Sequence, residues 1–261
     1  MPTFFIKHLT KYTYSGNVID AANQIMLYPI NDNFQKVVTQ DVEINMNPKV
    51  ETYTDAFDNT VGTFMIIERH DYLAIESEIE VITFPKKLPE DGLDVSQQWD
   101  NLSSIQGKAE FIDFLKVENF DGMEELSDII ISSKLKNKSP YQAVNELCEY
   151  FFTHLNYVQG LTTVNSTLDE VWKLKAGVCQ DFTNIMLQAV RILGVPARYV
   201  SGYISTNEGM TRGEGATHAW VEAYIPFYGW LGFDPTNNVV ANDSHVRLSV
   251  GRDYKDCAPV K

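Results

Sequence analysis

Three side chains suited to acyl-transfer chemistry stand in order in the second half of the chain: Cys179, His218 and Asp234. A cysteine supplies a sulfur nucleophile, a histidine can take its proton, and a carboxylate can orient the histidine. Each lies in a distinctive short segment, at 176–182, 217–222 and 232–236. The combination predicts acyl transfer through a thioester.

Cys179 is predicted to begin a helix. Gly194 is suited to a left-handed C-cap and Pro196 prevents continuation of the helix. Before them, apolar residues recur at helical spacing: Phe182, Ile185, Met186, Ala189 and Ile192. A thiol at a helix N-terminus faces the positive end of the macrodipole, so its pKa should fall from about 8.5. The unpaired N–H groups there can also bind an oxyanion.

His218 and Asp234 are predicted to share one face of a β-hairpin. The segment 225–229 has the composition of a turn. If the hairpin centres on Pro226 or Phe227, residue 218 lies opposite 234 or 236. Because side-chain direction repeats every two residues, both arrangements bring the imidazole and the carboxylate to the same face. Asp234 would then bind one ring nitrogen and leave the other facing the thiol.

The remaining candidates have structural interpretations. Cys148 lies in an apolar stripe, Cys257 needs no role, and three cysteines without a CxxC pair argue against a disulfide framework or zinc knuckle. A single thiol without short ligand spacing also disfavours a metal site, and no cofactor is implied. Asp181 is expected to cap a helix. The other histidines are expected to be structural or exposed: His8, His70, His154 and His245.

The pattern predicts an α+β protein with an N-terminal antiparallel β-sandwich. Residues 38–46 and 73–81 alternate between apolar and polar side chains, as half-buried strands do. We assign 1–85 to the sandwich, 86–120 to a connecting segment and 121–261 to a catalytic domain of helices followed by an antiparallel sheet.

Local signals place several elements of this catalytic domain. Ser139-Pro140 is typical of a helix start, and Thr167 with Glu170 has the spacing of a capping box. Three strands are expected after the Cys179 helix, at 198–205, 217–225 and 230–234. Between the first two, the glycine-containing segment 206–215 is expected to form a flexible rim that contributes to substrate specificity.

Composition narrows the classes of partner. The formal charge is −14, from 35 acidic and 21 basic residues, which disfavours nucleic acid and anionic membrane surfaces. No apolar stretch approaches the roughly 20 residues that span a bilayer. The N-terminus lacks the features of a signal peptide, so a cytoplasmic protein is expected.

Several segments resemble bacterial transglutaminase-like proteins. In the second half these are 177–203, 217–222, 229–238 and 251–254. Upstream, 12–14, 23–29 and 55–59 resemble the β domain that precedes the core in that family. The resemblance implies a papain-like fold and a Cys-His-Asp triad on Cys179, His218 and Asp234. Members are described as transglutaminase-like proteins or candidate cysteine proteases.

The resemblance implies hydrolysis of a peptide or isopeptide amide. Two alternatives stay open: transfer of the acyl group to an amine, as in a protein-glutamine transglutaminase, and a non-catalytic binding or scaffold module. Tyr157, Gln180 and Trp220 are candidates for substrate or oxyanion support. The β domain is a candidate site for a protein partner. Thr183-Asn184 departs from the small residue and histidine common in relatives, and relatives tend to continue past the point where this chain ends.

Overall fold

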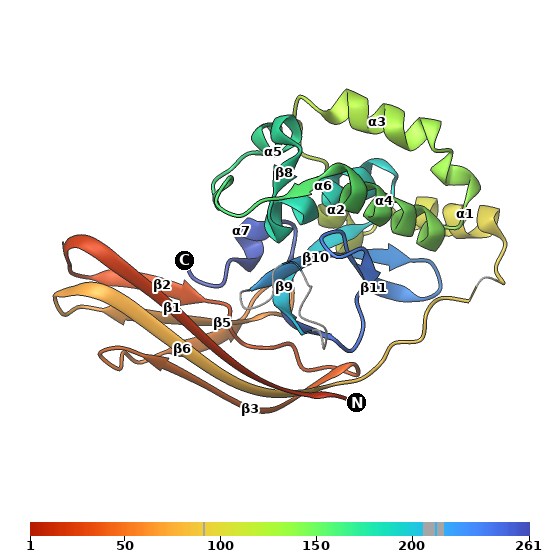
Figure 1. Cartoon of the computed structure of the whole chain (residues 1–261). Helices are drawn as coiled ribbons and strands as arrows, with labels where there is room; N and C mark the ends of the chain where they lie inside the picture. The colour runs from red at the N-terminus through yellow and green to blue at the C-terminus, as the bar shows by residue number, and fades with distance from the viewer. Residues whose placement is uncertain (91, 206–211, 213–216) are drawn as a thin grey trace.

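The computed structural model describes residues 1–90, 92–205, 212 and 217–261. Strands form the first third of the chain, helices follow, and a second sheet lies between the helices and the N-terminal strands (Figure 1). This order confirms the predicted class, an antiparallel β region followed by an α+β core. Within the described part of the chain, no helix is both long and apolar enough to cross a membrane.

The N-terminal region contains two three-stranded antiparallel sheets, in the orders β1-β6-β3 and β2-β5-β4. Their strands are β1 (Thr3–Val18), β2 (Ala21–Ile25), β3 (Gln35–Ile44), β4 (Glu51–Thr54), β5 (Thr60–Ile66) and β6 (His70–Thr83). Side chains from both sheets, among them Ile25, Phe64 and Ile75, are buried in one apolar cluster. This packing confirms the predicted sandwich.

One detail of β3 differs from the alternation expected over 38–46. The register between β3 and β6 shifts between Val37 and Thr39, so Val38 points outward and is 45% exposed. Met46 lies beyond the strand with a φ of 67° and is 41% exposed. A bulge inserts one residue and reverses the facing of its neighbours, which a strict two-residue period cannot anticipate.

Between the N-terminal strands and the helix that begins at Cys179, the described residues form five α-helices and one short 3₁₀-helix. The first two lie in the segment expected to connect the domains, and Leu102, Ile105 and Phe111 from them join the main apolar core. The elements are α1 (Val95–Ile105), α2 (Ala109–Leu115), α3 (Met123–Ser132), η1 (Leu135–Asn137), α4 (Pro140–His154) and α5 (Leu168–Leu174). The predicted caps form, because Ser139 with Gln142 and Thr167 with Glu170 each make both bonds of a capping box.

The helix α6 (Cys179–Ile192) begins at Cys179, as predicted. It ends in the expected left-handed glycine, because Gly194 has a φ of 88° and Val195 N–H donates to the Val190 carbonyl at 3.1 Å. This six-residue closure is a Schellman motif. The sequence signals therefore fix both ends of the helix that carries the cysteine.

The sheet that follows the helices has five strands, in the order β12-β11-β10-β9-β13. Its strands are β9 (Ala197–Ile204), β10 (His218–Ile225), β11 (Gly229–Asp234), β12 (Val239–Val240) and β13 (His245–Gly251). Along β10, Ala219 and Val221 belong to the core formed with the helices. Trp220 lies in a cluster with Ile30 and Phe57 of the N-terminal region. The sheet is thus covered on both faces.

The end of the chain ties the two regions together. After the short helix α7 (Tyr254–Cys257), Val260 forms an antiparallel bridge with Ile25 of β2. Lys261 and Gln24 exchange two backbone hydrogen bonds of 2.8 Å.

Candidate active site

The backbone around Cys179 is shaped by Gly177 and Asp181. The Asp181 carboxylate accepts the Val178 N–H at 2.8 Å and the Thr162 hydroxyl at 2.6 Å, and it is buried. Burial raises the pKa of Asp181 although both hydrogen bonds oppose the rise. A Cβ on Gly177 would lie 2.4 Å from this carboxylate, so only glycine fits there. Asp181 therefore caps the cysteine helix, as expected from the sequence.

His218 and Asp234 meet at the ends of two paired strands. Ile225 pairs with Gly229 and Val221 with Phe233, so the hairpin centres on Phe227. This register places residue 218 diagonal to 234, one of the two predicted arrangements. His218 Nε2 lies 2.7 Å from Asp234 Oδ2, and both side chains are fully buried.

The Asp234 carboxylate is held by several further donors. Oδ1 accepts the Thr236 N–H at 2.9 Å and the Asn237 N–H at 3.3 Å. Oδ2 also accepts the Asn237 side-chain amide at 2.8 Å. Burial alone would raise the pKa of Asp234, but His218 and His245 lower it well below its ordinary value. The group is therefore a fixed anion.

The pKa of His218 is raised, whereas that of Asp234 is lowered. Burial favours the neutral imidazole, but the Asp234 carboxylate and the nearby Cys179 outweigh it and raise the pKa of His218 to about 10. His218 Nδ1 is buried and has no hydrogen-bond partner among the described residues. The Cys179 thiol lies 4.0 Å from the carbonyl oxygen of Thr217, the residue before His218. Because Cys179 is among the groups that raise the pKa of His218, the thiol lies close to the imidazole.

The structure brings Cys179, His218 and Asp234 to one place, and their catalytic role stays a prediction. The other two cysteines are buried elsewhere. Burial raises the pKa of Cys148 and of Cys257 well above the ordinary value. Among the described residues, no group of three or more His, Cys, Asp or Glu side chains has the arrangement of a metal site.

The three support candidates take different positions. Tyr157 pairs with Gly177 in a two-residue parallel ladder, two positions before Cys179. Gln180 lines a cavity beside α6. Trp220 is 1% exposed and stacks near His218, with ring centroids 6.2 Å apart. The Trp220 ring can hold the imidazole, whereas Tyr157 and Gln180 lie where a substrate could be contacted.

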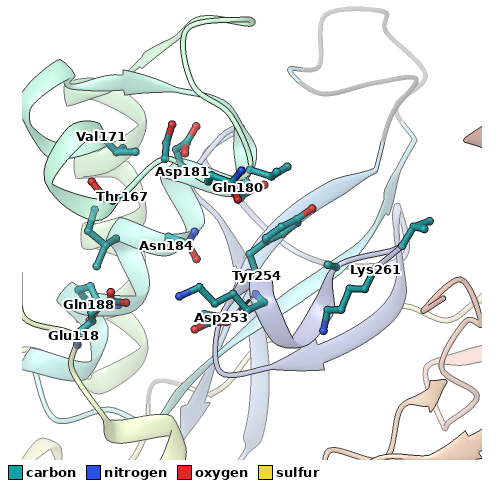
Figure 2. A pocket seen from close by; sticks show the side chains of 17 residues that line it. Glu118, Thr167, Val171, Gln180, Asp181, Asn184, Gln188, Asp253, Tyr254 and Lys261 are labelled. Atoms are coloured by element: carbon teal, nitrogen blue, oxygen red, sulfur yellow. Dashed lines mark hydrogen bonds between the residues drawn. The ribbon is translucent and has the colours of Figure 1, made fainter. Parts of the chain in front are cut away.

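The cavity has a volume of about 430 Å³ and lies between α6 and the C-terminal segment. Figure 2 shows Gln180, Asn184 and Gln188 on one side and Tyr254 and Lys261 on the other. Gln180, the first residue of α6 that lines the cavity, directly follows Cys179 in the sequence. Gln180, Asn184 and Gln188 line the cavity along α6, and Cys179 is not among its lining residues.

Sequence reasoning missed two residues of this site, Asn237 and His245. Asn237 lies in the segment 229–238, which resembles relatives. A residue a few positions after an aspartate can commonly donate a hydrogen bond to its carboxylate. His245 Nε2 lies 3.5 Å from Asp234 Oδ2, across the sheet. No sequence signal points to that contact. The predicted rim at 206–215 lies outside the described residues except for Arg212, whose N–H donates to Asn237 Oδ1 at 3.0 Å.

Comparison with known proteins identifies the family. The transglutaminase-like superfamily matches residues 131–235, which include all three candidate catalytic residues. The bacterial transglutaminase-like N-terminal region matches residues 4–82. An uncharacterized protein of Mycobacterium leprae is 30% identical over 263 residues, covering 98% of this chain and 91% of that protein.

The chain belongs to the transglutaminase-like superfamily. A protein-glutamine gamma-glutamyltransferase of Pseudomonas aeruginosa is 24% identical to this transglutaminase-like chain over 195 residues, or 71% of the chain and 27% of that protein. The crystal structure of a candidate cysteine protease from Cytophaga hutchinsonii has a TM-score of 0.80 at 20% identity, covering 99% of this chain and 84% of that one. The latter likeness establishes the fold of this family member.

Proposed function

We propose that the protein is a thiol-dependent enzyme that acts on amide bonds, with Cys179 as nucleophile, His218 as base and Asp234 as the group that orients His218. One observation carries the proposal. Asp234 engages His218 Nε2 at 2.7 Å, which leaves buried Nδ1 as the nitrogen available to the nearby thiol. A histidine oriented on one nitrogen and free on the other is what proton transfer in a triad requires.

The reaction would proceed in two halves. Because the pKa of His218 is raised to about 10, the imidazolium is favoured at neutral pH. His218 Nδ1 holds the proton taken from Cys179, and the thiolate attacks the amide carbonyl carbon to form a tetrahedral intermediate. Its oxyanion would be stabilised by N–H groups at the start of α6. On collapse the C–N bond breaks, the amine leaves with the proton from His218, and a thioester remains. Water, deprotonated by His218, then attacks the thioester, and the carboxylic acid and the thiol are released.

The cavity beside α6 supports a peptide or protein amide as the substrate. Its walls combine apolar and polar side chains, and the amide side chains Gln180, Asn184 and Gln188 follow one side of the helix. Amides can donate to and accept from the backbone of an extended chain. A bound peptide would run from Cys179 along these groups.

Labelling of the thiol tests the proposal directly. The wild type should react with iodoacetamide at neutral pH at Cys179, and Cys179→Ala should abolish this labelling. Cys257→Ala is the matched control, because that thiol is fully buried elsewhere and its loss should change nothing. Equal labelling of the wild type and Cys179→Ala would contradict the proposal and favour a non-catalytic binding or scaffold module.

Transfer to an amine is the second candidate, because the Pseudomonas aeruginosa relative is a gamma-glutamyltransferase. The two reactions share the thioester and differ in the acceptor. Incubation with a glutamine-containing peptide and a labelled primary amine separates them. Ammonia release without incorporation indicates hydrolysis, whereas incorporation that Cys179→Ala abolishes indicates transfer.

A protein partner at the N-terminal domain, residues 1–85, is a separate proposal. β1 is an edge strand, and its Phe5 and Leu9 are 78% and 59% exposed. If this domain binds a partner independently of catalysis, the double variant Phe5→Ser/Leu9→Ser should keep the wild-type rate of iodoacetamide labelling. A fall in that rate with unchanged melting temperature would contradict the separation of the two roles.

A further inference from the structure

Asp234 lies between two imidazole rings rather than beside one. His218 Nε2 is 2.7 Å from its Oδ2, and His245 Nε2 is 3.5 Å from the same atom. All three side chains are at most 2% exposed. A distance of 3.5 Å is too long for a hydrogen bond, but buried charges are screened little, so the contact still matters electrostatically. A second imidazole therefore faces the carboxylate that orients His218.

The contact is notable because β11 and β13 are not neighbours. Two strands, β10 and β9, separate them in the sheet. Gly202 of β9 stands between His218 of β10 and Arg247 of β13 in the paired register. It has no side chain, which lets Trp220 and β13 close over β9, and the ring centroids of His218 and His245 come within 6.5 Å. The fold thus delivers His245 to a site that its strand does not border.

The surroundings of His245 fix how its ring faces Asp234. Ser244 Oγ lies 3.1 Å from Nδ1, and the ring meets Trp220 edge-on at 5.0 Å and 78°. A hydroxyl can donate to Nδ1, whereas an ionised carboxylate can only accept. The tautomer that satisfies both neighbours carries its hydrogen on Nε2. Its N–H edge then points at Asp234.

We propose that His245 is a positioning residue of this site, whose Nε2–H holds Asp234 ionised and aligned with His218. The role rests on the proposed function, because alignment matters only if His218 transfers a proton. His245 touches neither the thiol nor any substrate. It acts through Asp234, whose Oδ2 also engages His218 and Asn237.

Three substitutions at position 245 separate this role from simple packing. His245→Phe keeps a ring against Trp220 but removes the N–H. His245→Gln can place its amide N–H near the former Nε2, whereas His245→Asn reaches only the position of Nδ1. We expect the rate of Cys179 alkylation to fall about 10-fold in the Phe and Asn variants, the scale of one buried charge-assisted contact. The Gln variant should restore most of it.

The pH profile of alkylation gives a readout that packing does not move. Loss of the N–H removes a positive dipole that faces Asp234. The other polar groups on this carboxylate are His218, Thr236 and Asn237, and Ser244 faces the far nitrogen of His245. The acid limb of the profile should therefore move to higher pH in His245→Phe and stay in place in His245→Gln. A Phe variant with wild-type rate and profile would overturn the proposal. A His245→Gln variant that is alkylated as slowly as His245→Phe and has an equally lowered melting temperature would also overturn the proposal.

Histidine ring nitrogen NMR of the full chain keeps this inference distinct from the proposed function. In the wild type, His245 Nε2 should carry the proton and Nδ1 should not, whether or not Cys179 reacts with any reagent. A His245 ring protonated only on Nδ1 would overturn the positioning role. If the tautomer is as expected but wild type and Cys179→Ala label equally, the proposed function fails instead.

Discussion

Gly202 of β9 pairs with His218 of β10, and there is no room for a side chain at Gly202. A Cβ there would lie 2.1 Å from the Val246 carbonyl oxygen and 2.6 Å from the Trp220 ring. One of these atoms is backbone, so the clash cannot be relieved by a rotamer change. The close approach of β13, and with it the position of His245, depends on this glycine.

Gly202→Ala should therefore destabilise the protein and disturb the site together. Because overpacking a core costs about 1–3 kcal/mol, we expect the free energy of unfolding to fall by about 2 kcal/mol. Alkylation of Cys179 should slow as His218 and His245 move apart. Urea unfolding and iodoacetamide labelling measure the two effects. Gly16→Ala is the control, since no atom lies within 4 Å of the Cβ position at Gly16; equal results for both variants would contradict the argument.

The His218–Asp234 pair should make stability depend on pH in a defined way. The pKa of His218 is raised from 6.5 to about 10, so its contribution is complete below 6.5 and is lost as the pH rises towards 10. The pKa of Asp234 is lowered, so its contribution is present above 3.8, the ordinary value, and is lost on acidification. The ion pair therefore stabilises the folded protein most between pH 3.8 and pH 6.5.

Asp234→Asn tests this window. The variant leaves a buried imidazole without its counter-charge, and breaking a buried pair typically costs about 3 kcal/mol or more. We expect the difference in unfolding free energy from wild type to be largest near pH 5 and to shrink steadily above pH 6.5. Urea unfolding across pH 4–10 measures it. A difference that grows with pH would show that the pair is not an ion pair in the folded protein.

The triad was predictable because its geometry follows from local rules. A glycine C-cap and an apolar stripe define α6, and the two-residue period of a hairpin aligns His218 with Asp234. The N-terminal antiparallel sheets were predictable for the same reason, since alternation marks their strands. Each of these signals is carried by residues close together in the sequence.

The features that were missed depend on contacts between distant segments. His245 reaches Asp234 because Gly202 leaves space, and nothing near His245 in the sequence indicates it. α1 was expected as part of a connection because only Gln98, Leu102 and Ile105 of its residues are buried, so its apolar stripe is weak. The pairing of Val260 with Ile25 joins the two ends of the chain and has no local signature.

Glu222 should contribute to stability through the same sheet. The buried Glu222 carboxylate accepts two hydrogen bonds from Arg198, of 2.6 and 2.8 Å, and lies 3.7 Å from Arg247. Burial would raise the pKa of Glu222, but the two arginines lower it to about 2. The ion pair therefore contributes its full stabilisation above pH 4.5, the ordinary value for a glutamate.

Glu222→Gln should lower the free energy of unfolding at pH 7 by about 3 kcal/mol, because it leaves the largely buried Arg198 guanidinium without its carboxylate, whereas Arg247 keeps Asp32. The loss should narrow as the pH falls from 4.5 towards 2, where the wild-type carboxylate also becomes neutral. Glu90→Gln, an exposed position before α1, is the matched control and should be within about 0.5 kcal/mol of wild type. Equal unfolding free energies for the two variants would remove Glu222 from the stabilising network.

The cavity beside α6 predicts a difference between small and peptide-bearing thiol reagents. Asn184 lines it one helical turn beyond Gln180, while Tyr254 on the opposite wall packs edge-on against Tyr199 at 6.2 Å. Cys179 is one of the groups that, after burial, raise the pKa of Tyr199, which places the thiol close to that wall. A reagent that extends into the cavity should gain contacts that iodoacetamide lacks.

Asn184→Leu removes the amide from the wall without touching the three candidate catalytic residues. We expect wild type to react faster with an iodoacetylated tripeptide than with iodoacetamide, and the variant to lose about 10-fold of that advantage, as for one lost substrate hydrogen bond. Its rate with iodoacetamide should stay at the wild-type level. Lys173→Leu, exposed on α5 outside the cavity, is the control. If Asn184→Leu slows both reagents equally, the residue supports the thiol rather than the substrate; if it slows neither, the peptide does not follow α6.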